Sequence, residues 1–566
     1  MASTSTSLGL LADFNVQNFV ALLQKGGRGS ELHCVSGPFG QTINLLLDPK
    51  AEFWLASYEA LVLWTLPERA IPTFGKVLLC EEYDQEDLLK EVDAFAGMVE
   101  RIPGTVRTVF IPSWTAPAAE RGWGTLDLTV GVANALMRMN LQLAARLEKN
   151  RRVVLLDAQR WLTADGVGAY NPKLWYLSKT PFDVTVFQEA AGDLLAALDG
   201  IRGRSKKMVV LDLDDTLWGG VVGDVGWQNL RLGGHDPAGE AFVDFQKALK
   251  RLMRRGIILS IVSKNEEAVA LEAIREHPEM ILRIDDFAGW RINWQDKAQN
   301  LIELVSELNL GMDSVVFLDD SPFERARVRE ALPQVLVPDL PNDPMRYPSF
   351  LSRMKCFDNP SVSSEDRSRT RMYVADRART ESRKQIESLN EWLAMLGLGV
   401  AVEPLSAKNL ERAAQLFNKT NQMNLSTRRL SVVELLTWAQ AEGHTLWTFR
   451  VWDRFGDYGL CGIGSLVRDG TVGQIVDFLL SCRVMGRGVE DAMLAALLQR
   501  ARESGCDTVW VDYAPTAKNL PCKKWLYNLT AVAIEGNRLT FSLNHATAFP
   551  AHIKMSLTEV NERICV

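Results

Sequence analysis

The segment from Met208 to Gly220 (Met-Val-Val-Leu-Asp-Leu-Asp-Asp-Thr-Leu-Trp-Gly-Gly) constrains the fold of this chain more than any other. Its apolar start is typical of a strand that is buried in a parallel sheet. Asp212 and Asp214 follow at the carboxyl end of that strand, where open α/β sheets bind their ligands. A buried carboxylate is costly without a partner or a metal. The segment therefore predicts a doubly wound α/β domain whose acidic site holds a divalent cation and attacks a phosphate.

Three further features place a polar residue at the end of a predicted strand or at the start of a predicted helix. One buried-type strand ends at Ser263, a helix begins at Lys297, and another strand runs into Asp319 and Asp320. In a doubly wound sheet such positions converge on one edge. We therefore expect these side chains to join the two aspartates of the first segment.

The chemistry predicted for this site is phosphoryl transfer that depends on Mg²⁺. Asp212 is the expected nucleophile, which forms an aspartyl phosphate, and Asp214 is the expected acid and base for the leaving oxygen and for water. Mg²⁺ would be held by Asp212, Asp319 and the backbone carbonyl of Asp214, with Asp320 completing the acidic set.

The remaining polar residues of the predicted site would act on the charge of the phosphate. Ser263 is expected to donate a hydrogen bond to the phosphoryl oxygens, and Lys297 to neutralise their charge in the transition state. Asp320 would orient Lys297 or a water on the metal.

Length and composition indicate a soluble protein of several domains. The chain has 566 residues, and its net charge of −7 argues against a nucleic-acid-binding protein, which would favour a basic domain. No apolar run is long enough to span a membrane, and the first residues lack the basic start of a secretory signal. The eight cysteines are dispersed without a Cys-x-x-Cys pair. These features predict a cytoplasmic protein without a zinc site or a disulfide framework.

The pattern of apolar runs and breaks divides the chain into four regions. Alternating strands and helices predict an α/β domain over 1–204 and a second one over 205–345. A charged segment with a helical pattern predicts a connector over 346–396, and the rest, 397–566, has a mixed α+β pattern. In the first domain, strands are expected at 31–35, 59–64, 108–112 and 152–157, and helices at 84–101 and 130–149.

The last region contains a strand, a glycine loop and a helix in succession, at 475–480, 483–488 and 489–503. Backbone N–H groups of such a loop at a helix N-terminus bind phosphates. Arg483, Gly486 and Gly488 are therefore candidates to bind CoA or the phosphopantetheine arm of a carrier protein. The neighbouring Cys482 is either an acyl-carrying thiol, activated by Arg483 and the helix N-terminus, or a small buried apolar residue.

Several sequence words resemble the haloacid dehalogenase (HAD) superfamily and, within it, the FkbH-like branch of subfamily IIIC. Four words lie in the predicted HAD domain: Asp-Leu-Asp-Asp-Thr-Leu-Trp-Gly-Gly-Val-Val-Gly from Asp212, Gly-Glu-Ala-Phe from Gly239, Ser-Lys-Asn from Ser263 and Phe-Leu-Asp-Asp-Ser-Pro-Phe-Glu-Arg from Phe317. A fifth, Phe-Asn-Lys-Thr-Asn-Gln-Met-Asn-Leu-Ser-Thr-Arg-Arg, begins at Phe417 in the C-terminal region.

The resemblance covers nearly the whole chain and extends to its flanking domains. It implies an SGNH-like α/β domain before the HAD domain and a GNAT-like acyltransferase fold after it. Ser36 lies where an esterase nucleophile could lie, but no Gly-Asp-Ser word accompanies it, so a docking or structural role is the expectation for the first domain. Only a short segment, 218–237, follows the first HAD motif, which implies a minimal cap and an open site.

The FkbH-like resemblance implies an activity and its partners. Such proteins dephosphorylate a three-carbon acyl donor, 1,3-bisphosphoglycerate or a similar compound. They load the glyceryl unit onto an acyl carrier protein in polyketide or related natural-product biosynthesis. This chain has Leu213 between the two motif aspartates, where members that load glycerate often carry cysteine.

Two other functions stay open at this point: a phosphatase that acts on another carrier-bound or small metabolite, and a GNAT-type acyltransferase whose HAD domain is a scaffold. The oligomeric state, the cognate carrier and the pathway product are not given by the sequence.

Overall fold

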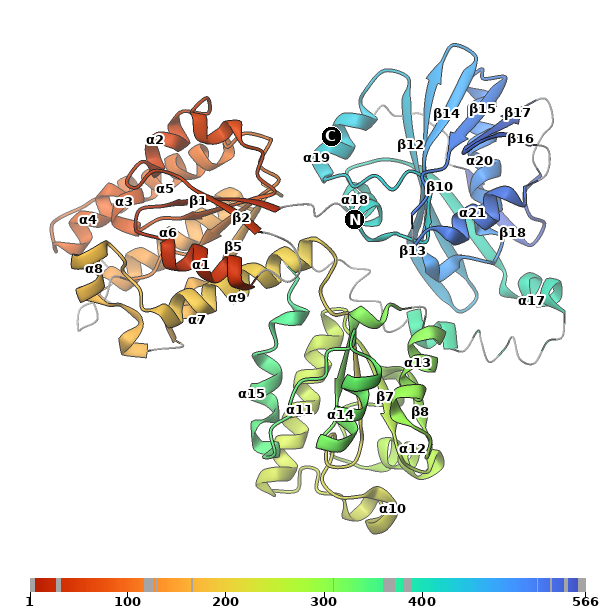
Figure 1. The fold of residues 1–566 in the computed structure, drawn as a ribbon, viewed down its shortest axis with the longest axis horizontal. Helices are drawn as coiled ribbons and strands as arrows, with labels where there is room; N and C mark the ends of the chain where they lie inside the picture. Colours follow the sequence, from red (N-terminus) through yellow and green to blue (C-terminus); the bar gives the residue numbers. More distant parts are fainter. Residues whose placement is uncertain are drawn as a thin grey trace. The chain divides into compact units, whose positions relative to one another are not determined.

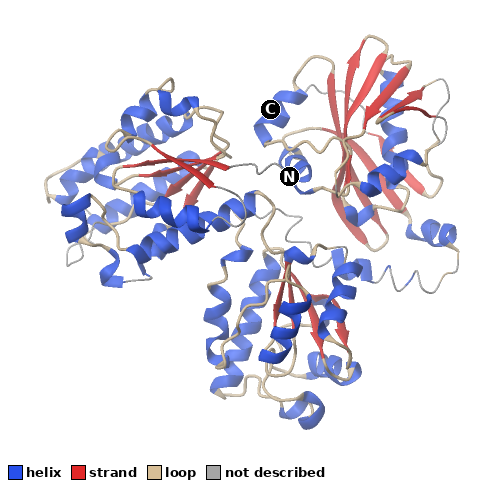
Figure 2. Ribbon diagram, in the orientation of Figure 1, coloured by secondary structure: helices blue, strands red, loops and turns tan. Residues whose placement is uncertain are grey.

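The computed structural model of this protein describes residues 6–26, 32–116, 127, 131–163, 166–308, 310–359, 372–377, 379, 382, 386, 388–516, 518–529, 532–543 and 548–557. The chain forms two units, Met1–Asp199 and Gly200–Val566. Figures 1 and 2 show the elements of each unit. None of the helices in the described part of the chain has the length and apolar character that a membrane crossing requires.

The first unit contains a five-stranded parallel sheet in the order β2-β1-β3-β4-β5. Its strands are β1 (Thr6–Ala12), β2 (Leu32–Ser36), β3 (Ala60–Trp64), β4 (Thr108–Pro112) and β5 (Val153–Leu156). Its helices are α1 (Gln17–Gly26), α2 (Thr42–Leu47), α3 (Pro67–Ala70), α4 (Pro72–Leu78), α5 (Gln85–Glu100), α6 (Val132–Leu147), α7 (Ala158–Thr163), α8 (Pro172–Ser178) and α9 (Val184–Ile201).

The four strands and two helices expected in this region are confirmed to within about two residues at each end, the usual uncertainty of element boundaries. β1, which lies between β2 and β3, was not among the expected elements. Its sequence carries Gly9, a residue that weakens strand patterns, but a Cβ there would lie 2.9 Å from the side chain of Leu61 on β3. The glycine therefore permits the close approach of two neighbouring strands.

Both faces of this sheet are covered, as expected for parallel strands. Along β3, Leu61 and Leu63 pack into one apolar cluster, and Val62 and Trp64 pack into the other. Burial of side chains of this kind contributes roughly 1.5–3 kcal/mol each.

The part of the second unit that contains the sequence words resembling the HAD superfamily, called the HAD-like part after that resemblance, has a four-stranded parallel sheet in the order β8-β7-β6-β9. The strands are β6 (Met208–Leu211), β7 (Ile258–Ser263), β8 (Phe287–Ile292) and β9 (Val315–Leu318). The helices are α10 (Val222–Val225), α11 (Pro237–Arg254), α12 (Glu267–Glu276), α13 (Lys297–Glu307), α14 (Pro322–Ala331) and α15 (Tyr347–Ser352).

The register of β6 aligns the predicted site. β6 lies between β7 and β9, with Leu211 level with Ile261 on one side and with Leu318 on the other. Asp212 is therefore level with Asp319, and Ser263 ends β7 two residues beyond Ile261. Val209 and Leu211 pack into one apolar cluster and Met208 and Val210 into another, so the sheet is buried on both faces and doubly wound.

The C-terminal part of the second unit is a mixed sheet in the order β16-β17-β15-β14-β13-β12-β10-β18, with β11 paired to β14. Its strands are β10 (Leu398–Pro404), β11 (Met423–Asn424), β12 (His444–Asp453), β13 (Gly456–Asp469), β14 (Val472–Leu480), β15 (Thr508–Asp512), β16 (Val532–Glu535), β17 (Arg538–Ser542) and β18 (Ile553–Leu557). Its helices are α17 (Leu389–Leu396), α18 (Leu410–Lys419), α19 (Val432–Ala439), α20 (Val489–Glu503) and α21 (Leu520–Tyr527).

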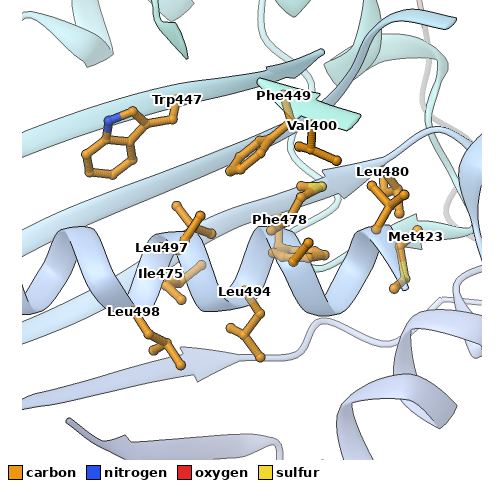
Figure 3. Packing of buried hydrophobic residues seen from close by; sticks show 14 of the residues in the cluster. Val400, Met423, Trp447, Phe449, Ile475, Phe478, Leu480, Leu494, Leu497 and Leu498 are labelled. Carbon is orange, nitrogen blue, oxygen red and sulfur yellow. The ribbon is translucent and has the colours of Figure 1, made fainter. Parts of the chain in front are cut away.

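Helix α20, which has the bounds expected from the sequence, packs its apolar face on this sheet. Figure 3 shows Leu494, Leu497 and Leu498 of the helix against Phe449 and Phe478 of the strands. β14 pairs in parallel with β15 only over its first residues, from Val472 to Ile475. The remainder of β14 runs on to Leu480, where the predicted glycine loop begins.

Of the connector predicted over 346–396, residues 346–359, 372–377, 379, 382, 386 and 388–396 are described, and the rest lies outside the described residues. The described residues 372–377 are helical. From this segment Tyr373 packs into an apolar cluster of the HAD-like part, and Arg379 pairs with the buried Asp453 of β12 at 2.6 Å.

Candidate functional site

Three carboxylates meet at the carboxyl end of the HAD-like sheet. Asp212 follows β6, and Asp319 and Asp320 follow β9. One oxygen of each lies within 4.8 Å of the others. Asp212 and Asp319 are buried, with exposed fractions of 7% and 0%, and Asp320 is half-buried. The structure thus brings together the three side chains that the sequence proposed for metal binding.

Lys297, the first residue of α13, provides the positive charge at this site. Its Nζ lies 3.0 Å from Asp212 Oδ2 and 2.7 Å from Asp319 Oδ2. Burial by itself would lower the pKa of Lys297, but the charges of Asp212 and Asp319 raise it above its usual value. The lysine is therefore held in its charged form between the two aspartates. Its role in neutralising a phosphate stays a prediction.

One cation does not balance three carboxylates. Burial, reinforced by the charge of Asp212, raises the pKa of Asp319 to about 6 despite the opposing charge of Lys297. Burial and the charge of Asp212 also raise the pKa of Asp320. Asp212 Oδ1 is buried and has no hydrogen-bond partner. An all-oxygen donor set with an unpaired buried oxygen fits Mg²⁺, a hard cation that carboxylates bind.

Asp214 is held in one orientation by three donors. Its Oδ1 accepts hydrogen bonds from Trp218 Nε1 at 2.9 Å and from the Val222 backbone N–H at 3.1 Å. Its Oδ2 accepts one from Asn265 Nδ2 at 2.8 Å. Burial raises the pKa of Asp214, although these hydrogen bonds oppose the shift. A positioned carboxyl group with a raised pKa suits the acid and base role that the sequence predicted.

Asp320 and the backbone after β9 are braced by two residues that the sequence reasoning did not assign. The backbone N–H of Asp320 donates to Thr216 Oγ1 at 3.1 Å. Arg325, which is buried, donates from Nη1 to the carbonyl oxygens of Asp319 and Asp320 at 2.7 and 2.6 Å. These contacts hold the paired aspartates at the strand end.

The sequence analysis assigned no role to four residues that brace the site, and all four lie inside the sequence words that resemble the HAD superfamily. Trp218 and Asn265 fix Asp214, and Thr216 and Arg325 fix the loop after β9. The signal that could have found them is a side chain able to donate a hydrogen bond within a few residues of a predicted site residue: Asp214 for Thr216 and Trp218, Ser263 for Asn265, and Asp320 for Arg325. Ser263, which the sequence analysis proposed as a hydrogen-bond donor to the phosphate, is buried at the end of β7.

Leu213, between the two motif aspartates, points into the protein core. It is fully buried in the apolar cluster that also contains Leu211, Leu217 and Trp218. Asp212 and Asp214 therefore share the site, while the residue between them packs behind it, as the alternation of an extended chain requires.

In the first unit, Ser36 is the last residue of β2 and is exposed. β2 is an edge strand of the sheet, whereas β1 is next to it in the interior. The SGNH-like assignment of this unit stays a prediction.

The glycine loop of the C-terminal part follows β14, as expected. Gly486 and Gly488 have φ values of +73° and +80°, which glycine adopts without strain. Gly488 precedes α20, and a Cβ there would lie 3.1 Å from the ring of His552. Arg483 Nε donates to Ser481 Oγ at 3.1 Å.

Cys482 lines a cavity of about 910 Å³ at the end of β14. Burial raises the pKa of the Cys482 thiol, although the charges of Arg483 and Lys207 oppose the shift. The activation expected from Arg483 is therefore outweighed by burial in this structure. The cavity walls are rich in cations, which include Arg204, Lys207, Lys419, Arg483 and Lys518.

The chain is similar to a solved phosphatase domain. The N-terminal part of the protein BF1531 from Bacteroides fragilis contains a phosphatase domain and was solved in complex with Mg. It is 27% identical to this chain with a TM-score of 0.58, and the match covers 63% of this chain and 95% of that one. This similarity supports a phosphatase domain, and hence an enzyme. No family model and no curated protein matches the sequence.

Solved acetyltransferases match a smaller part of the chain. A spermidine N-acetyltransferase from Vibrio cholerae is 15% identical with a TM-score of 0.22, covering 25% of this chain and 95% of that one. The ribosomal-protein-S18-alanine N-acetyltransferase from Escherichia coli is 12% identical with a TM-score of 0.21. The match covers 26% of this chain and 96% of that one. At these scores the matches carry no weight for the fold or the activity of the C-terminal part.

Proposed function

We propose that this protein is an FkbH-like, Mg²⁺-dependent enzyme of the HAD type that loads a three-carbon acyl unit onto an acyl carrier protein and removes its phosphate. The observation that carries the proposal is the cluster of Asp212, Asp319 and Asp320 around Lys297, with one buried carboxylate oxygen left without a partner. The similarity to a phosphatase domain solved with Mg supports it.

Phosphate removal would use Asp212 and Asp214 in turn. An oxygen of Asp212 attacks phosphorus, the bond from phosphorus to the substrate oxygen breaks, and Asp214 gives its proton to that oxygen. Asp214 then takes a proton from water, which attacks the aspartyl phosphate and releases inorganic phosphate and Asp212. The contacts of Asp214 with Trp218 and Asn265 keep it in place for both steps.

The other site residues would lower the electrostatic cost of these steps. Lys297 neutralises the phosphoryl oxygens, and Ser263 donates a hydrogen bond to them. Asp212, Asp319, Asp320 and the Asp214 carbonyl would hold Mg²⁺, which when bound supplies further positive charge beside the phosphate.

Acyl loading would be a separate step that needs a thiol. With 1,3-bisphosphoglycerate or a similar acyl phosphate, the thiol attacks the carbonyl carbon, the bond to the phosphate oxygen breaks, and phosphate leaves. The thioester product keeps the second phosphate, which the HAD-like site then removes. The cation-rich cavity beside Cys482, together with Arg483, Gly486 and Gly488, would receive the phosphopantetheine arm.

A phosphatase without acyl transfer is a second candidate, and two observations favour it. Leu213 packs into the core, so no thiol lies between the motif aspartates. Burial raises the pKa of Cys482, which leaves less thiolate at neutral pH. In this case the flanking domains would recruit a phosphorylated substrate.

The intact mass of the carrier protein distinguishes these functions. The full-length protein is incubated with 1,3-bisphosphoglycerate, Mg²⁺ and a phosphopantetheinylated carrier. A glyceryl mass increment is the expected result, and free phosphate with an unmodified carrier would overturn acyl loading and support the phosphatase. Acylation from an acyl-CoA without Mg²⁺ would instead support a GNAT-type acyltransferase with a scaffold HAD domain.

Cys482→Ala tests which thiol accepts the acyl group. If Cys482 is a relay, the variant loses carrier loading, and with it the phosphate release that the HAD-like site performs on the thioester. Carrier loading at the wild-type rate would show that Cys482 is structural and that the carrier thiol attacks directly.

A further inference from the structure

The glycine loop before α20 does not offer all of its backbone donors to a ligand. The N–H of Gly486 donates to Oε1 of Glu490 at 3.0 Å. Glu490 lies in the first turn of α20, and its exposed fraction is 9%. A carboxylate of the protein thus sits where an anion bound to this loop would accept a hydrogen bond.

The loop's second arginine is also engaged within the protein. The Arg487 guanidinium donates to Asp376 at 2.7 Å and contacts the hydroxyl of Tyr458. Its side chain is largely buried, and its backbone carbonyl lies 2.8 Å from His552 Nε2. Arg487 therefore serves to hold the loop, which leaves Arg483 as the loop arginine that lines the cavity.

The start of α20 carries an excess of negative charge. Glu490 and Asp491 both lie in its first turn, where they satisfy the positive end of the helix dipole. Glu490 Oε2 is buried and has no hydrogen-bond partner. Burial raises the pKa of Glu490, with the charge of Asp491 adding to the shift. A second anion at this place would compete with Glu490 for the N–H of Gly486 and for the positive end of the helix.

We propose that Glu490 is a specificity-determining residue, which excludes the diphosphate of CoA from the glycine loop and leaves the cavity to the single phosphate of a carrier-bound phosphopantetheine arm. This inference rests on the proposed function, in which that arm enters the cavity. The single phosphate is matched by cations of the cavity wall, including Arg483, Lys419 and Lys518, and does not require the N–H of Gly486.

Calorimetric titration of the full-length protein with CoA and with free phosphopantetheine tests the inference. Glu490→Ala removes both the charge and the acceptor for Gly486. We expect it to tighten CoA binding by about tenfold or more, equivalent to roughly 1.4 kcal/mol, while the affinity for phosphopantetheine changes by less than about threefold. Glu490→Gln keeps the acceptor and removes only the charge, so a smaller gain in CoA affinity is expected.

Asp491→Asn is the matched control, because it removes one charge from the same helical turn without freeing the N–H of Gly486. In the wild type the Asp491 carboxylate accepts a hydrogen bond from Trp525 Nε1 at 2.8 Å and none from Gly486. Equal CoA affinities in Glu490→Ala and Asp491→Asn would overturn the inference, as would a wild-type protein that binds CoA more tightly than phosphopantetheine.

A second readout separates this inference from the proposed function. If carrier loading occurs but CoA affinity does not respond to Glu490, only the specificity role is wrong. Failure of every variant to bind phosphopantetheine would overturn both the inference and the assignment of the cavity to the arm. The isosteric Glu490→Gln keeps the test valid if Glu490→Ala does not fold.

Discussion

Two buried acidic clusters in the second unit differ in how their charge is balanced. At the end of β6, Asp212 and Asp319 share one lysine, and an oxygen of Asp212 has no partner. On β14, the fully buried Asp477 is paired with Arg428 and accepts hydrogen bonds from Ser426 and Ser465 at 2.6 and 2.7 Å. The cluster around Asp212 has too few donors and positive charges for its carboxylates, and we call it the under-compensated cluster. Asp477 has a partner for both of its oxygens, and we call its network the saturated cluster.

This difference separates a site from a structural network. A buried charge is tolerated when donors of its own protein satisfy it, and the Asp477 network meets that condition. The cluster at β6 and β9 does not meet it, because Lys297 is shared by Asp212 and Asp319 and an oxygen of Asp212 has no hydrogen-bond partner. Burial of an aspartate alone does not indicate function, because Asp477 is as fully buried as Asp319. The cluster of Asp212, Asp319 and Asp320 differs from the Asp477 network in that three carboxylates share one lysine and Asp212 keeps an unpaired oxygen.

The largest effect is expected at the predicted nucleophile. Asp212→Asn should reduce phosphate release by about three orders of magnitude or more, because no other group at the site replaces the attacking oxygen. Circular dichroism should show an unchanged fold. The control is Asp244→Asn, an exposed carboxylate of α11 paired with Lys247, which should retain full activity. Near-normal turnover in Asp212→Asn would contradict the mechanism.

Substitutions in the saturated cluster should lower the free energy of unfolding and leave phosphate release unchanged. Arg428→Met leaves Asp477 buried without its cation, a change that typically costs about 3–5 kcal/mol of the free energy of unfolding. Arg450→Met breaks the exposed pair with Asp457 and should cost less than about 1 kcal/mol. Urea unfolding measures both. Similar losses in the two variants would show that the buried network is not structural.

Binding of Mg²⁺ should stabilise the under-compensated cluster. At a concentration about 100 times its dissociation constant, a ligand specific for the folded state adds roughly 2.7 kcal/mol. We therefore expect Mg²⁺ to raise the melting temperature of the wild type and of Asp244→Asn, and to do so much less in Asp319→Asn. An equal rise in all three proteins would place the cation elsewhere.

The smallest effect concerns an unpaired carboxylate in the first unit. Glu68 Oε2 is buried without a partner, and burial raises the pKa of Glu68. The folded chain therefore binds this proton more tightly than the unfolded chain. The contribution of Glu68 to stability is present below the ordinary carboxyl pKa and is lost as the pH rises through the raised value.

Glu68→Gln should therefore stabilise the first unit at pH ~7 by a small amount, and the gain should shrink at lower pH, where the wild-type carboxyl is protonated. Hydrogen exchange of β1 and β3 peptides, corrected for the intrinsic rate, measures it. Glu81→Gln, at an exposed position, is the control. A gain that grows as the pH falls would contradict the sign.

Much of the HAD-like site could be predicted because its residues follow a local rule. Asp212, Ser263 and Asp319 each come at the end of an apolar run, and Lys297 opens an amphipathic helix. Parallel strands bring such positions to one edge. Asn265 could not be assigned this way, since it acts through a contact with Asp214, 51 residues away in the chain. Trp218 and Arg325 contact aspartates only four to six residues away, but their side chains do not end an apolar run or open a helix.

The C-terminal loop shows the limit of a sequence pattern. Arg483, Gly486 and Gly488 have the order of a phosphate-binding loop, and the positive φ angles agree with the glycines. The contact of Arg487 with Asp376 joins residues 111 positions apart, so no local pattern contains it. The contact of Glu490 with Gly486 spans four residues, but the phosphate-binding pattern of the glycines does not include it.

By itself the sequence determined the strand and helix order of the HAD-like part, the identity of its charged residues and the edge at which they meet, because side-chain periodicity and parallel pairing are local consequences of chain order. Only the tertiary structure decided which carboxylates are compensated. In the folded protein Leu213 packs into the core, Asp477 has hydrogen-bond donors for both oxygens, and one oxygen of Asp212 has no partner. Compensation depends on distances between residues that lie far apart in the chain, and these distances exist only in the folded protein.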